Sequence, residues 1–70
     1  MFDYSKLKGR VIEKLGSMKI YADRLGISET QLSKKINNRA GFSQADIIQS
    51  CKILDIATRD IGSFFFALKV

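Results

Sequence analysis

Apolar residues recur at intervals of three and four along most of this chain, which is the spacing of one face of an α-helix. Between positions 4 and 15 they follow this spacing directly after Asp3, a residue type that caps helix N-termini. Gly16 then offers the left-handed conformation in which helices commonly end. The pattern therefore predicts a first helix between Asp3 and Gly16.

Two short helices are predicted next. Ser17 is placed to cap the first of them, and Gly26 to stop it. Ser28 is placed to cap the second, which carries its apolar residues at helical spacing up to position 36. The pair Asn37-Asn38 ends this helix, because Asn tolerates the left-handed conformation. Residues 38–42 are interpreted as a loop.

The pattern over residues 43–70 predicts two more helices. Ser43 and Asp46 have the spacing of a capping box and open a fourth helix that reaches position 54. Thr58 is placed to cap a last turn or two. The final residues suit either a helix or a strand, and we favour a short helix that gives way to an extended tail by about Phe66. The expected fold is all-α, with five helices in a single domain over residues 1–70.

The charge is unevenly distributed. The chain has 70 residues and a net charge of +5. Residues 1–45 hold nine of its twelve Lys and Arg and four of its seven Asp and Glu, whereas residues 46–70 are neutral overall. The first part is therefore the candidate surface for an anionic partner, and the remainder is interpreted as support.

The residue types that are missing exclude most catalytic chemistry. The chain has no His and a single Cys, Cys51, which excludes Ser-His-Asp and Cys-His catalysis, a histidine-ligated metal and an internal disulfide. We therefore expect no enzyme activity, no metal and no cofactor. The N-terminus lacks the order of a signal peptide and no apolar run approaches the length of a membrane span, so a cytoplasmic location is expected.

The most informative pattern surrounds Gly26. Ala22 is small enough to let two helices cross closely, and Gly26, four residues later, permits a tight turn. Ile27 is placed to fill the turn from inside, and Leu32 to anchor the next helix to the same core. Together these residues have the spacing of a helix-turn-helix over about residues 17–38.

The free side of the third helix follows from the rotation of about 100° per residue. With Leu32 facing the core, Thr30, Lys34 and Asn37 fall on the far side, flanked by Gln31 and Ser33. This face is polar and net positive, and it carries no acid. Such a surface suits the major groove of DNA, where Lys donates to guanine and Thr contacts a thymine methyl group.

The segment from Ser17 to Asn38, SMKIYADRLGISETQLSKKINN, resembles the Cro/repressor-type helix-turn-helix family of temperate phages. The wider chain, from FDYSKLKG to its end in FFFALKV, is similar to a subgroup of very small Cro-like phage proteins. The resemblance implies a sequence-specific transcriptional regulator in the host cytoplasm. It would bind a pseudo-palindromic operator in double-stranded DNA as a homodimer, with the third helix in the major groove. Neither a membrane nor a small-molecule ligand is implied.

Specific residues receive roles on this interpretation. The residues predicted to read bases are Glu29, Thr30, Gln31, Ser33 and Lys34. The residues predicted to contact phosphates are Ser17, Lys19, Lys35, Asn37, Asn38 and Arg39. The residues predicted to form a dimer interface are Phe64, Phe65, Phe66 and Leu68.

The chain departs from the family pattern at three positions. Met18 stands where many members place a Gln that holds a phosphate, Glu29 stands where the recognition helix often begins with Gln, and Lys35 occupies a position that is often apolar. Glu29 suits either the accepting role beside a cytosine amino group or the positive end of the helix. The alternative function is a protein-interaction module, an antirepressor or modulator of a larger repressor, whose third helix contacts protein instead of DNA.

Overall fold

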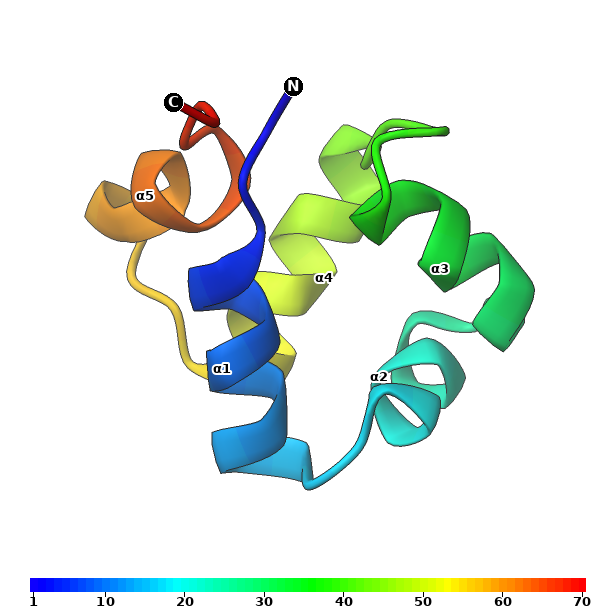
Figure 1. Ribbon diagram of the computed structural model, residues 1–70. Helices are drawn as coiled ribbons and strands as arrows, with labels where there is room; N and C mark the ends of the chain where they lie inside the picture. The colour runs from blue at the N-terminus through cyan, green and yellow to red at the C-terminus, as the bar shows by residue number, and fades with distance from the viewer.

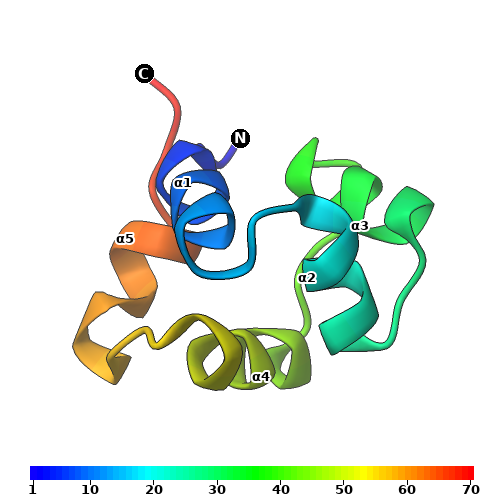
Figure 2. The same cartoon turned by 90° about the horizontal axis from the view of Figure 1, so that it is seen from below.

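The computed structural model describes all 70 residues and has the predicted all-helical architecture. Its five α-helices and one 3-10 turn are α1 (Ser5–Leu15), α2 (Met18–Leu25), α3 (Glu29–Ile36), α4 (Gln44–Leu54), η1 (Thr58–Asp60) and α5 (Ile61–Phe65). Figures 1 and 2 place α5 at one side of the molecule and α3 at the other, with α1 and α4 between them. No helix combines the length and the apolar character needed to cross a membrane.

The ends of the central helices follow the predicted stop and cap residues. Gly16 and Gly26 close α1 and α2 with φ values of 83° and 73°, in the left-handed region that glycine adopts without steric cost. Ser17 caps α2 by accepting a hydrogen bond from the Ile20 amide. Asn38, with a φ of 62°, turns the chain away after α3 as predicted.

Two predicted caps differ from the structure. Asp3 was expected to cap α1, but Tyr4 is the N-cap residue, and the Asp3 carboxylate instead accepts hydrogen bonds from the amide and hydroxyl of Ser5. Thr58 was expected to cap the last helix, but it begins the 3-10 turn and makes no capping hydrogen bond through its side chain. Both differences shift a helix start by one or two residues and leave the element order unchanged.

The core lies where α1, α2, α4 and α5 meet, and α3 contributes Leu32 to it. Its eleven buried hydrophobic residues are Tyr4, Leu7, Val11, Tyr21, Ala22, Leu25, Leu32, Leu54, Ile56, Phe64 and Phe65. Within it, the hydroxyl groups of Tyr21 and Ser50 share a hydrogen bond of 2.6 Å, and neither residue is exposed to solvent. Burial raises the pKa of Tyr21 to about 12.

The two chain ends are held together beside the loop that follows α3. Phe2 and Leu68 form an isolated antiparallel bridge, and the Lys69 amide donates to the Met1 carbonyl. The side-chain amide of Asn38 binds both backbone groups of Phe2, accepting from its N–H at 2.8 Å and donating to its carbonyl at 2.9 Å. The chain leaves the helix at Phe66 and continues as an extended tail, as predicted.

Candidate interaction surface on α3

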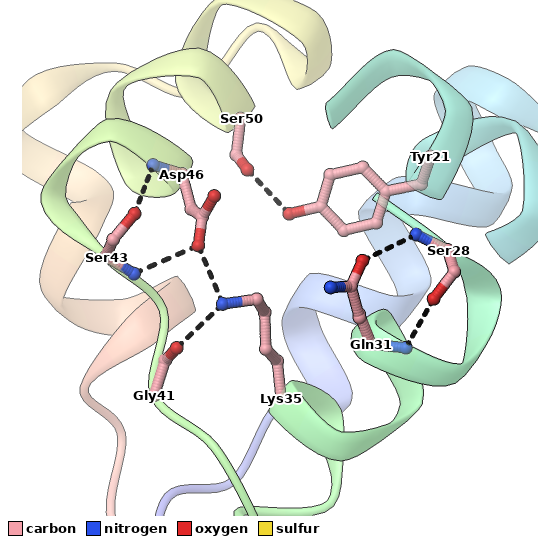
Figure 3. A network of polar contacts seen from close by, with 8 residues as sticks. All are labelled: Tyr21, Ser28, Gln31, Lys35, Gly41, Ser43, Asp46 and Ser50. Atoms are coloured by element: carbon pink, nitrogen blue, oxygen red, sulfur yellow. Dashed lines mark hydrogen bonds and ion pairs between the residues drawn. The ribbon is translucent and has the colours of Figure 1, made fainter. Parts of the chain in front are cut away.

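Helix α3 is held at its N-terminus by a complete capping box. The Ser28 hydroxyl accepts a hydrogen bond from the Gln31 amide at 3.1 Å, and the Gln31 side chain accepts one from the Ser28 amide at 2.9 Å (Figure 3). Leu32, which is only 2% exposed, faces the core as predicted. These contacts determine which residues of α3 point away from the molecule.

At its other end, α3 is tied to α4 by an ion pair. The Lys35 ammonium lies 2.9 Å from the Asp46 carboxylate and also donates to the Gly41 carbonyl (Figure 3). Partial burial alone would raise the pKa of the Asp46 carboxyl. The hydrogen bonds from Lys35 and Ser43 outweigh that effect and lower the pKa below its ordinary value. Lys35 was predicted to contact phosphate, but its charge is already compensated within the molecule.

The outward face of α3 contains a shallow hollow of about 470 Å³ that has no apolar residue in its lining. We call it the polar hollow, and its lining residues are Glu29, Thr30, Ser33, Lys34, Asn37 and Arg39. It brings together four of the predicted base-reading residues and two of the predicted phosphate contacts. Lys34 and Arg39 are exposed and take part in no ion pair, so both charges are available to a partner.

The other predicted contact residues lie elsewhere or are already engaged. Gln31 belongs to the capping box, Asn38 holds Phe2, and the Ser17 hydroxyl caps α2. Lys19 is exposed on α2, outside the polar hollow. The structure therefore does not gather the whole predicted set into one surface. The sequence pattern correctly placed the outward face but could not distinguish side chains that the fold uses internally.

A second hollow lies along the same helix and shares Glu29, Ser33 and Asn37 with the first. It has a volume of about 350 Å³, and we call it the methionine hollow. Its lining residues are Lys8, Met18, Glu29, Leu32, Ser33, Ile36 and Asn37. Sequence reasoning did not assign Lys8 or Ile36 to a site. The only sequence feature that indicated this hollow was Met18, which stands where the family resemblance implies a polar residue.

The aromatic residues near the C-terminus divide between the core and the surface. Phe64 and Phe65 are buried, so they belong to the core of the single chain. Phe66 and Leu68 are 52% and 70% exposed. Of the four residues predicted to form a dimer interface, only these two are therefore free to contact another molecule. The homodimer itself stays a prediction.

Comparison with known proteins places this fold among phage regulators. The family described as "Protein of unknown function (DUF739)" matches residues 1–68. No curated protein matches the chain. Among solved structures, the solution structure of the modulator of repression (MOR) of the temperate bacteriophage TP901-1 from Lactococcus lactis matches with a TM-score of 0.83. The two sequences are 33% identical, and the match covers 99% of this chain and 93% of that one.

This likeness corrects the function expected from the sequence. The prediction of a Cro-like repressor that binds operator DNA is wrong, because a solved protein that is similar to this chain over nearly its full length is a modulator of repression. The alternative, a modulator or antirepressor, agrees better with that finding. The helical pattern around Gly26 led to the error because it reports how two helices pack and carries no information about what their outer face contacts.

Proposed function

This chain belongs to the DUF739 family, and on that premise we propose that it is a modulator of repression that acts by binding a larger repressor protein. The observation that carries the proposal is the similarity to MOR, at 33% identity over 99% of the chain. The proposal assigns the chain no catalytic step. Its action is the formation of a protein–protein complex that changes how the repressor occupies its operator.

The outward face of α3 is the surface best suited to this contact. The capping box and the Lys35–Asp46 ion pair hold the helix at both ends, so little order has to be imposed on it when a partner binds. Lys34 and Arg39 project from this face without an internal partner. Charged groups placed in this way steer association and select a partner of opposite charge.

The test measures binding of the purified chain to purified repressors encoded in the same genome, by isothermal titration calorimetry. Lys34→Glu should weaken the complex about tenfold or more, because it puts a negative charge at the centre of the contact face. Lys52→Glu is the matched control. Lys52 is also an exposed base in the last turn of a helix, but it lies on α4, and its replacement should leave the affinity unchanged.

A functional readout accompanies the binding measurement. A repressor is first bound to its operator DNA, and the shift of that DNA in a native gel is followed as the chain is added. The proposal requires the chain to change operator occupancy at concentrations where Lys34→Glu does not. It would be overturned if the chain bound none of the repressors, or if it bound one without altering occupancy.

A further inference from the structure

The methionine hollow combines an apolar floor with a polar rim. Met18 and Ile36 are half-buried and lie with the buried Leu32 at its floor, while Lys8, Ser33 and Asn37 around them are exposed. An apolar centre enclosed by polar residues is the typical arrangement of a protein–protein contact. The hollow therefore offers space in which an apolar side chain would be removed from water.

Met18 is suited to receive such a side chain. It is the first residue of α2, and it packs against the core without being fully covered. Methionine is unbranched and polarisable, so it adapts to partner side chains of different shape. The half-buried Met18 leaves apolar area in water in the free protein, and this area is removed from water when a partner covers it.

The charges around the hollow specify the partner's chemistry. The two hollows along α3 are lined by three bases, Lys8, Lys34 and Arg39, and by a single acid, Glu29. None of these three bases forms an ion pair within the chain, whereas Lys35 beside them is paired with Asp46. The surface thus carries uncompensated positive charge next to an apolar floor, and its complement is apolar with acidic flanks.

We infer that the methionine hollow is the socket for one aliphatic side chain of the partner, held there by a partner carboxylate that pairs with Lys8. The inference rests on the proposed function and specifies the chemistry of the segment that α3 contacts. The occupant is an acidic protein segment. Lys8 joins α1 to the contact, so the interaction surface extends from α3 across the N-terminal end of α2.

Two substitutions separate the apolar and the charged contributions to binding at the methionine hollow. Met18→Gln keeps the length of the side chain but places an amide over the floor of the hollow, and it should weaken binding to the repressor about tenfold at any salt concentration. Lys8→Glu should weaken binding to a similar extent at low salt and less at high salt, because an exposed ion pair is screened. Ile48→Gln and Lys52→Glu are the matched controls on the exposed face of α4.

A direct readout avoids dependence on variants. The methyl resonance of Met18 in the unaltered chain should shift when the purified repressor is added. For the variants above, thermal unfolding checks that each one retains the fold. The inference is overturned if Met18→Gln and Lys8→Glu bind like the unaltered chain. It is also overturned if duplex DNA, lipid vesicles or a higher concentration of the chain moves this resonance while the repressor does not.

The same experiments distinguish the inference from the function on which it rests. If the unaltered chain binds no repressor, the proposed function fails. If the chain binds and Lys34→Glu weakens the complex while the Met18 resonance stays in place, the function stands and the socket is rejected.

Discussion

Tyr21 and Ser50 make a fully buried polar contact between α2 and α4, with 2.6 Å between their hydroxyl oxygens. Replacing either residue alone leaves the other hydroxyl in the core without a partner. We expect Tyr21→Phe and Ser50→Ala each to lower the free energy of unfolding by about 1–3 kcal/mol. Urea-induced unfolding followed by circular dichroism measures these changes.

The double variant tests whether this loss comes from the orphaned hydroxyl. Removing both groups leaves no unsatisfied polar atom, so the double variant should lose clearly less stability than the sum of the two single variants. Strictly additive losses would contradict the assignment and would mean that the hydroxyl groups contribute independently.

The contact between α3 and α4 depends on the ionised form of Asp46. Because the pKa of Asp46 is lowered from 3.8 in the folded chain, this carboxylate stabilises the fold above that value, and the stabilisation is lost as the pH falls through the folded-state pKa. We expect Asp46→Asn to lower the free energy of unfolding by about 1 kcal/mol or more at neutral pH. The difference from the unaltered chain should shrink below about pH 4.

Asp55→Asn is the control for this pH dependence. Asp55 follows α4, its side chain is 90% exposed, and its φ of 54° is one that Asn also tolerates. Asp55→Asn therefore removes one carboxylate charge, as Asp46→Asn does, without changing a contact of α3. The measurement is the melting temperature of the unaltered chain, Asp46→Asn and Asp55→Asn across acidic pH. If the melting temperature of Asp46→Asn depended on pH as that of the unaltered chain does, the role of the Lys35–Asp46 ion pair would be refuted.

Asn38 links three distant parts of the molecule, since it ends α3 and holds Phe2, which is bridged to Leu68. Asn38→Gly keeps the left-handed backbone but removes both side-chain hydrogen bonds. We expect hydrogen exchange of the Asp3 and Lys69 amides, which donate to the Ala67 and Met1 carbonyls across the paired chain ends, to accelerate about tenfold, because these ends then open more easily. The amides of α2 should exchange as before and serve as the internal reference.

Asn38→Asp gives a graded comparison for the whole-molecule effect. The Asp side chain retains an acceptor for the Phe2 amide but loses the donor to the Phe2 carbonyl. The exchange rate at the chain ends should therefore fall between those of the unaltered chain and Asn38→Gly. If Asn38→Gly left the chain ends as protected as before, the bridge and the tail would be stable without the Asn38 contacts.

The sequence by itself determined the elements and most of their ends, because these depend on residues a few positions apart. The cap at Ser28 and the Ser43–Asp46 capping box each act within four consecutive residues, and the left-handed stop at Gly26 is local to one. The outward face of α3 also followed from rotation about the helix axis once Leu32 was placed in the core. Local backbone chemistry was therefore sufficient to predict the fold class and the outward face of α3.

Only the tertiary structure decided which polar side chains remain available on that surface. Lys35 and Asp46 are eleven positions apart, and Asn38 and Phe2 are thirty-six, so neither pairing leaves a sequence signal. Lys8 and Met18 likewise meet only when α1 and α2 pack beside α3. Charge and hydrophobicity can be counted along a chain, but whether a given charge is compensated, or a given apolar side chain covered, depends on which distant groups the fold brings within contact distance.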